Sequence, residues 1–312
     1  MYLVRLCCLA ALALVAAHAA EADVSEFPRA AVTTLEAQIA LGRRDFSCGS
    51  LDGVFGLQTA AAVKAFQERE HLTISGVLDA ATKEHLTLNS EPLTQTSLTQ
   101  VDLDRLQPLK PTWAEKSEQT ALDYETALEM VAERSHAAPA LIRHLNPGVE
   151  WDQIDPTVKL TVPAFPGKPA RIRAERVVIY LASHVLEALD PDDKILAHFP
   201  VSIAARVQKR PEGELHVVVT VRNPDYTFDP ENFPESEEAR ALGHKLILPA
   251  GPNNPVGLVW IGLDRAGYGI HGTPEPEHVG RTESHGCFRM TNWDAQALLD
   301  YVSIGMPVEV AP

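Results

Sequence analysis

Two short segments in the last third of the chain combine residue types that enzymes use for nucleophilic catalysis. The first is Ile270-His271-Gly272-Thr273, and the second is Ser284-His285-Gly286-Cys287-Phe288-Arg289-Met290. A cysteine thiol is mostly protonated at neutral pH, but a neighbouring imidazole can accept its proton and leave a strongly nucleophilic thiolate. The pattern therefore predicts acyl transfer through Cys287, with a histidine as the proton acceptor.

The residues beside Cys287 suit the same chemistry. Gly286 has no Cβ, so the backbone at Cys287 can approach a substrate closely, and N–H groups there can face an oxyanion. Arg289 lies two residues further on and projects to the same side if the segment is extended. Its guanidinium could hold a carboxylate through two parallel hydrogen bonds.

Two alternatives compete with a free catalytic thiol. Cys287 could form a disulfide with Cys48, the other cysteine outside the N-terminal segment. Alternatively, His271, His285 and Cys287 could provide nitrogen and sulfur ligands at three corners of a zinc tetrahedron.

The N-terminal segment predicts export. Arg5 precedes the apolar run 6–17, and Ala17-His18-Ala19 supplies the small residues of a signal-peptidase site. The apolar run is short for a membrane span, so residues 1–19 are interpreted as a cleaved signal peptide, with a retained membrane anchor as the alternative. No second long apolar stretch follows, so no stable membrane insertion is expected after cleavage.

The composition limits the fold class and the kinds of partner that the protein can bind. The chain has 312 residues, which favours two or three domains, and its 45% hydrophobic content is typical of a globular protein. It carries 27 Lys and Arg against 42 Asp and Glu, for a net charge of −15. Such an acidic chain lacks the field for non-specific binding of nucleic acid or of an anionic membrane. Four cysteines are too few for a disulfide-built scaffold.

Residues 31–88 predict three short helices separated by glycine turns. The segment Leu51-Asp52-Gly53-Val54-Phe55-Gly56, then Thr59, then Ala62 to Gln67, then Gly76-Val77-Leu78-Asp79 with Thr82, resembles the three-helix peptidoglycan-binding domain. That all-α domain is assigned to residues 30–90, with Asp79 as a helix N-cap. Phe55, Val63 and Phe66 are expected in its core, and Asp52 is expected to fix a loop.

Residues 91–120 are rich in Ser, Thr, Gln and Pro and are interpreted as a linker. Residues 121–165 then show two weakly periodic helical segments, Asn146-Pro147, and Leu160-Thr161-Val162-Pro163. This pattern resembles a degenerate LysM module, a small α+β glycan-binding unit of strand, two helices and strand. A spacer domain is the alternative, because the usual glycine-rich start is missing.

Residues 175–311 predict a mainly β domain. The segments 177–181, 216–221, 246–248, 258–263 and 307–310 are short and apolar, and turn residues separate them. One convincing helix follows Asn292, which is the expected cap.

This domain resembles the L,D-transpeptidase catalytic (YkuD) domain, whose hallmark is His-Gly-Thr followed by Ser-His-Gly-Cys-x-Arg-Met/Leu. The resemblance extends over further segments: Asn223-Pro224-x-Tyr226, Pro249 to Gly257 including Asn254, Gly267 to Ile270, and Thr291-Asn292-Trp293-Asp294. One departure is Arg210, in Lys209-Arg210-Pro211-Glu212-Gly213, where the family commonly has threonine.

The resemblance implies roles for individual residues. Cys287 matches the nucleophile and His271 its proton partner; Ser284, His285, Gly286 and Gly272 match the oxyanion and pocket positions. Arg289, Tyr226 and Asn254 match substrate-binding positions.

The implied reaction is transpeptidation between peptidoglycan stems through a cysteine thioester, giving 3→3 cross-links. It needs no metal and no other cofactor. The implied partners are stem peptides and wall glycan, in a periplasm or cell-wall space. The alternatives are a carboxypeptidase or other hydrolase with the same site, and a wall-binding protein with a silent catalytic domain.

Overall fold

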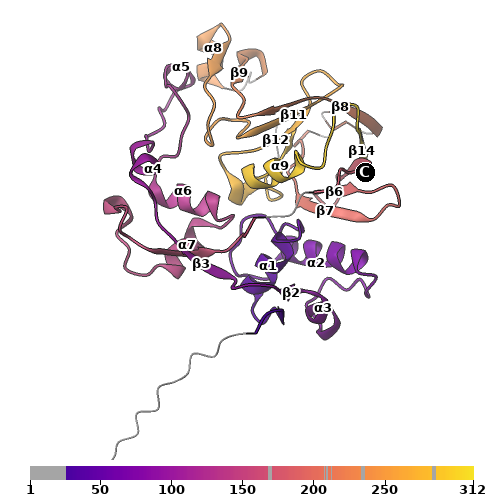
Figure 1. The fold of residues 1–312 in the computed structure, drawn as a ribbon. Coiled ribbons are helices and arrows are strands. Elements are labelled where there is room, and N and C mark those ends of the chain that lie inside the picture. The colour runs from indigo at the N-terminus through magenta and orange to yellow at the C-terminus, as the bar shows by residue number, and fades with distance from the viewer. Residues whose placement is uncertain are drawn as a thin grey trace, which may run out of the picture.

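The computed structural model describes residues 26–167, 171–206, 208, 210–211, 213–232, 236–282 and 286–312. The expected signal peptide, Ser284 and His285 therefore lie outside the described residues. Along the chain, a helical N-terminal part and an α+β middle part lead into a β-rich C-terminal part, and all three pack together (Figure 1).

The N-terminal part contains the three predicted helices. Its elements are β1 (Arg29–Ala30), α1 (Thr34–Gly42), α2 (Leu57–Arg69), α3 (Ala80–His85) and β2 (Thr87–Leu88), with β1 and β2 antiparallel. The Asp79 carboxylate accepts from the Thr82 N–H at 2.8 Å and caps α3, as predicted. Val63 and Phe66 are buried as expected, whereas Phe55 is 39% exposed in the loop before α2. The Asp52 carboxylate does fix its loop, accepting from the Val54 N–H at 2.8 Å.

The middle part begins earlier than the sequence suggested. Its elements are β3 (Leu93–Thr96), α4 (Gln100–Asp104), α5 (Trp113–Ser117), α6 (Ala127–Arg134), α7 (Pro139–Leu145), a 3₁₀ turn η1 (Trp151–Gln153) and β4 (Leu160–Pro163). Strands β3 and β4 are antiparallel, so a strand, two helices and a strand do occur, with α4 and α5 inserted after the first strand. Residues 91–120 are therefore not a structureless linker. Their short helices rest on capping boxes at Thr99 and Thr112, which hydrophobic periodicity does not reveal.

The C-terminal part is built on one eight-stranded sheet in the order β13-β12-β11-β8-β14-β5-β6-β7. These strands are β5 (Arg176–Tyr180), β6 (Val185–Leu189), β7 (Ile195–Pro200), β8 (Gly213–Arg222), β11 (Val259–Leu263), β12 (Gly269–His271), β13 (Phe288–Arg289) and β14 (Pro307–Ala311). A separate hairpin pairs β9 (Tyr226–Phe228) with β10 (Leu246–Leu248). The remaining elements are η3 (Pro230–Asn232), α8 (Glu237–Leu242), η4 (Pro276–His278) and α9 (Asn292–Leu298).

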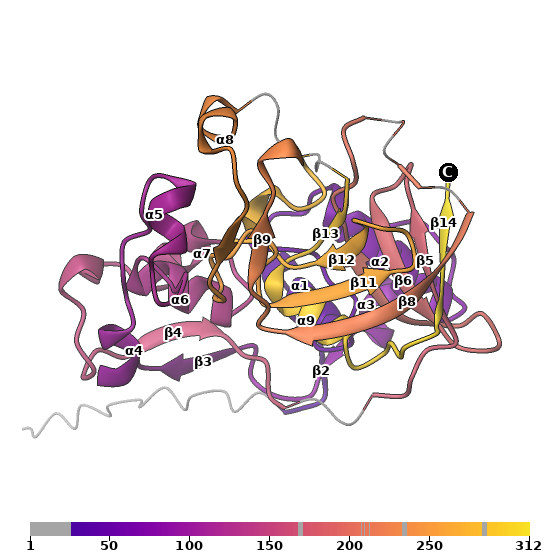
Figure 2. The ribbon, with the colours of Figure 1, turned by 90° about the horizontal axis from the view of Figure 1, so that it is seen from above.

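The sheet curls until its two ends meet. Ser202, just after β7, exchanges backbone hydrogen bonds of 2.8 and 3.0 Å with Arg289 of β13. Helix α9 packs against β11 and β12, as Figure 2 shows from above. Its N-cap is Thr291, whose hydroxyl accepts from the Asp294 N–H at 3.2 Å. The predicted cap, Asn292, is instead the first helical residue, and its side chain is free to bond elsewhere.

The loop after α1 joins the three parts. The backbone N–H of Ser47 donates to His198 of β7 at 2.8 Å, and that of Leu51 donates to His136 after α6 at 2.9 Å. Residues from all three parts, including Phe46, Ile142 and Val178, share one hydrophobic cluster. Burying apolar surface jointly makes the parts mutually dependent for stability. Across the described ranges, no helix is long and apolar enough to cross a membrane.

Candidate active site

The two segments singled out in the sequence form adjacent parallel strands. Strand β12 pairs with β13 in the register Ile270 to Phe288 and His271 to Arg289. Paired residues on neighbouring strands project to the same face, and Cys287 precedes Arg289 by two positions. The fold thus pairs His271 with Arg289 at the place where the sheet closes, and Cys287 immediately precedes β13.

The thiol of Cys287 sits between two backbone groups of the chain leading into β12. Its Sγ donates to the carbonyl oxygen of Gly267 at 3.3 Å. Burial raises the pKa of the Cys287 thiol, and a hydrogen bond from the backbone N–H of Gly269 opposes that rise. The Gly269 N–H is therefore a preformed donor for the thiolate when the proton leaves.

His271 is held in one tautomer. Its Nδ1 lies 2.6 Å from the carbonyl oxygen of Gly272, which can only accept, so Nδ1 carries the proton. Nε2 then presents a lone pair and is the basic atom of the ring. The ring stacks on Trp260 of β11, with centroids 5.8 Å apart, and only 8% of the residue is exposed.

The electrostatics favour a neutral resting pair rather than a preformed thiolate–imidazolium pair. Burial lowers the pKa of His271 to about 4, the Gly272 hydrogen bond opposes the shift, and the positive charge of Arg289 adds to it. The pKa of Cys287 moves the other way. At neutral pH the site holds a thiol and a neutral imidazole, so the proton must move as the thiol attacks.

Two of the predicted substrate-binding residues lie at this site. Arg289 is half-buried, and its guanidinium donates to the Thr282 hydroxyl at 2.7 Å. Burial raises the pKa of Tyr226 to about 12, and the negative charge of a Cys287 thiolate adds to the rise, so the two groups interact electrostatically. Tyr226 comes from the separate β9–β10 hairpin.

The third, Asn254, is not placed to contact a substrate. It is fully buried, and its Nδ2 donates to the Pro249 carbonyl at 2.9 Å while Oδ1 accepts from the Val256 N–H at 2.9 Å. Its amide shapes the loop that carries it. The sequence suggested a substrate contact because Asn254 falls in a family-like segment, and the burial of that segment could not be seen.

Of the four residues predicted to form the pocket and the oxyanion site, the structure describes two, Gly272 and Gly286. Gly272 is buried, and its N–H donates to Val259 at 3.2 Å, so it shapes the pocket rather than offering an oxyanion donor. At Gly286, a Cβ would meet nothing within 4 Å, so the space beside Cys287 is open on that side. Ser284 and His285 lie outside the described residues, and their expected roles stay predictions.

Neither alternative to a free thiol gains support. Cys48 is buried and both it and Cys287 are free cysteines, which excludes the disulfide. Of the zinc ligand set, His285 is not described, and the described residues contain no group of three acidic, His or Cys side chains arranged for a metal ion.

Two neighbours of the site were missed from sequence. The ring of Trp260 lies 2.7 Å from where a Cβ on Gly269 would be, so this position must be glycine for the ring to cover His271. Alternation along 259–263 could have indicated Trp260 as a residue on the same face as His271. No local signal could indicate Glu133 of α6, which bonds to Asn292 across 159 residues.

The N-terminal part also reaches the site. Gln58, at the start of α2, donates from Nε2 to the carbonyl oxygen of Val279 at 2.7 Å. Asp52 faces Arg281 at 3.9 Å. The segment that leads to Thr282, the partner of Arg289, is thus held against the N-terminal part.

Comparison with known families agrees with this division of the chain. Residues 174–310 match the L,D-transpeptidase catalytic domain (YkuD), and residues 33–86 match the "Putative peptidoglycan binding domain". The C-terminal part of the chain is therefore similar to L,D-transpeptidase catalytic domains, and its N-terminal part is similar to peptidoglycan-binding domains.

Individual relatives cover different shares of the chain. "Putative L,D-transpeptidase YkuD" of Bacillus licheniformis is 25% identical over 59% of this chain and 93% of its own length. "Probable L,D-transpeptidase ErfK/SrfK" of Escherichia coli is 30% identical, but the chain spans only 53% of that protein. A solved L,D-transpeptidase from Mycobacterium smegmatis is 20% identical, with a TM-score of 0.34 over 50% of this chain and 63% of the other.

Proposed function

We propose that the protein is an exported L,D-transpeptidase that forms 3→3 peptidoglycan cross-links through a thioester on Cys287. The observation that supports this proposal is the β12–β13 register, which pairs His271 with Arg289, while Cys287 immediately precedes β13. The Nδ1–Gly272 bond adds the correct tautomer for a proton acceptor.

In the acylation step the Cys287 sulfur attacks the carbonyl carbon between the third stem residue and the fourth, D-Ala. The thiol proton passes to Nε2 of His271 as the sulfur–carbon bond forms. The carbon–nitrogen bond to D-Ala then breaks, and the same proton goes to the departing amine. A thioester to the third stem residue remains on the enzyme.

In the second step an acceptor amine attacks the thioester. The side-chain amine of the diamino acid on a second stem forms the new amide bond, and its proton returns through His271 to the released thiol. If water is the acceptor, the same site acts as an L,D-carboxypeptidase, which is the alternative function. Both routes use only side chains and substrates, so no cofactor enters the proposal.

The other site residues then acquire roles. Arg289 neutralises a carboxylate of the donor stem, since it pairs with His271 in the sheet and its positive charge acts on that residue. Tyr226 contributes a phenol that stays protonated, because burial raises its pKa. Gly286, with Ser284 and His285, supplies the oxyanion donors.

Wall attachment involves the two preceding parts. The peptidoglycan-binding domain docks its Gln58 on the segment beside the catalytic site, so bound glycan would lie close to the nucleophile. The β3–α6–α7–β4 arrangement supports a LysM-like glycan-binding module with α4 and α5 inserted. Export through the 1–19 signal would place the enzyme in the periplasm or cell-wall space, where this substrate exists.

The direct test uses the chain without residues 1–19 and purified disaccharide-tetrapeptide muropeptides. Mass spectrometry should show 3→3 cross-linked dimers and free D-Ala, and the Cys287→Ala variant should form neither. Tripeptides without dimers would favour the hydrolase. Unchanged muropeptides with an alkylatable thiol would contradict both functions and favour a silent catalytic domain.

A further inference from the structure

Helix α6 of the middle part directs two carboxylates into the catalytic domain. Glu129 and Glu133 are four residues apart and so lie on one face of the helix. Glu129 accepts from the Asn253 side chain at 2.6 Å, and both carboxylate oxygens of Glu133 accept from Nδ2 of Asn292 at 3.1 Å. Asn292 opens α9, which α6 contacts directly.

Burial of the Glu133 carboxylate costs free energy, because the charged form loses its hydration. Glu133 is 8% exposed and has no ion-pair partner within the described ranges, so its bonds come from Asn292 and from the Tyr124 hydroxyl at 3.1 Å. Burial raises the pKa of Glu133 to about 7, although the bonds from Asn292 and Tyr124 oppose the rise. A buried carboxylate without a cation destabilises a fold unless its hydrogen bonds offset the loss of hydration.

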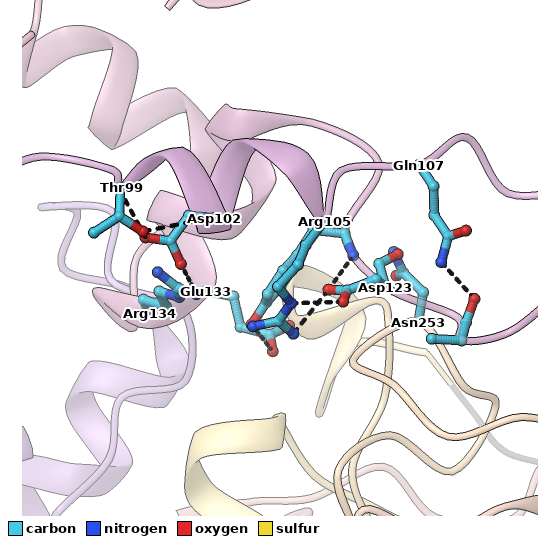
Figure 3. A network of polar contacts seen from close by, with 10 residues as sticks. Thr99, Asp102, Arg105, Gln107, Asp123, Glu133, Arg134 and Asn253 are labelled. Carbon is cyan, nitrogen blue, oxygen red and sulfur yellow. Dashed lines mark hydrogen bonds and ion pairs between the residues drawn. The ribbon is translucent and has the colours of Figure 1, made fainter. Parts of the chain in front are cut away.

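The segment before α6 is fixed against the loop of the catalytic domain that carries Asn253. Figure 3 shows Arg105 paired with Asp123, at 2.8 Å, and Gln107 bonded to the neighbouring backbone. The Asp123 carbonyl accepts from Asn253 at 3.0 Å. Neighbouring Arg134 is engaged by Asp102 rather than by Glu133. The approach of α6 to the catalytic domain is therefore well defined.

Asn292 passes this contact on to the active site. Its Oδ1 accepts from the Leu258 N–H at 3.0 Å, and its Nδ2 also donates to the Pro252 carbonyl at 3.1 Å. The same Oδ1 lies 2.1 Å from where a Cβ on Gly272 would be. The carboxamide therefore rests directly on the Gly272 residue, whose carbonyl holds Nδ1 of His271.

We propose that Glu133 is a positioning residue for His271: it holds the Asn292 carboxamide, which fixes the Gly272 peptide that sets the histidine tautomer. The middle part of the chain thereby completes the active site from outside the catalytic domain. The inference rests on the proposed use of His271 as the base, but its test does not require peptidoglycan turnover.

The experiment compares Glu133→Gln with the wild-type chain and with Ser47→Ala. The glutamine is nearly isosteric, but its amide sets a donor against the Nδ2 donor of Asn292. Ser47→Ala is the matched control, because the Ser47 hydroxyl makes a buried 2.9 Å bond from another part of the chain to Asp294 in α9 and not to Asn292. Thermal unfolding checks that each variant is folded.

Two readouts report on the site itself. In ¹⁵N-histidine-labelled protein, the His271 ring should show a protonated Nδ1 in the wild type and in Ser47→Ala, and a mixture of tautomers in Glu133→Gln. Alkylation of Cys287 by iodoacetamide, located by peptide mass spectrometry, should slow by roughly 10- to 100-fold in Glu133→Gln, as expected of a misplaced catalytic group.

Glu133→Asp, which keeps the charge but falls one methylene short, should change both readouts in the same direction and serves if the glutamine variant folds poorly. An unchanged His271 tautomer in a folded Glu133 variant overturns the proposal, as does an equal change in Ser47→Ala. If the wild-type chain forms no 3→3 products while these readouts are as expected, the result contradicts the proposed function alone.

Discussion

Nδ1 of His271 donates to the carbonyl oxygen of Gly272, the next residue in the chain, at 2.6 Å. A backbone carbonyl thus does the orienting that a carboxylate does in many Cys–His and Ser–His sites. Because the carbonyl is neutral, it does not stabilise an imidazolium as a carboxylate would, which agrees with the low pKa of His271.

Removing the imidazole should therefore slow the acylation of Cys287 without removing the nucleophile. His271→Ala should slow acylation of Cys287 by a carbapenem by roughly 10²–10⁴-fold, the usual worth of a positioned proton-transfer group. Raising the pH should restore part of the rate, and the rescue should need a pH above the free thiol value of about 8.5, because burial raises the pKa of Cys287. Intact-protein mass spectrometry against time gives the rate.

His285→Ala is the paired variant for that experiment, because His285 is nearer to Cys287 in sequence. It should keep the pH profile of the wild type. If His285→Ala is rescued by alkaline pH and His271→Ala is not, the two histidines have been assigned the wrong way round.

Gly272 should tolerate no side chain. A Cβ there would lie 2.1 Å from Oδ1 of Asn292, so Gly272→Ala must displace the carboxamide. Overpacking of this kind costs on the order of 1–3 kcal/mol of unfolding free energy. Gly167→Ala, where a Cβ meets nothing within 4 Å, is the control for chemical denaturation, and equal midpoints for the two variants would contradict the packing.

Much of this arrangement follows from local sequence. The helices of residues 31–88 and the five strands predicted in residues 175–311 reflect periodicity, turn residues and short motifs that act over a few positions. The errors have one cause in common. Asn254, Asn292 and Glu133 take their roles from contacts between distant segments, and α4 and α5 rest on caps within a polar stretch.

The raised pKa of Glu133 makes the stability of the fold depend on pH. A carboxyl whose pKa is higher in the folded than in the unfolded chain binds more protons when folded, so stability is greatest below the unfolded value and falls as pH rises to about 7. Glu133→Gln removes that titration and should flatten the decline. Melting temperatures between about pH 5 and pH 8 check this, since an equally steep decline would assign it to Glu129, whose pKa burial also raises.

Wall binding should be tested by surface substitutions rather than by deletion of residues 31–88, because that part shares its core with the rest of the chain. Leu57 is 91% exposed at the start of α2, next to Gln58. Leu57→Ser should weaken sedimentation with insoluble peptidoglycan while sparing turnover of soluble muropeptides. Ile304→Ser, at a 70% exposed site in the catalytic domain, is the control. Equal sedimentation of both variants would contradict a binding surface at Leu57.

The central claim is a thioester between Cys287 and the third residue of a donor stem. Intact-protein mass spectrometry during incubation with a tetrapeptide donor and no acceptor should show an adduct of the donor minus D-Ala. Fragmentation should place the adduct on the peptide that contains Cys287, and the Cys287→Ala chain should show none. An adduct that persists in Cys287→Ala, or product formation by that variant, would contradict the mechanism.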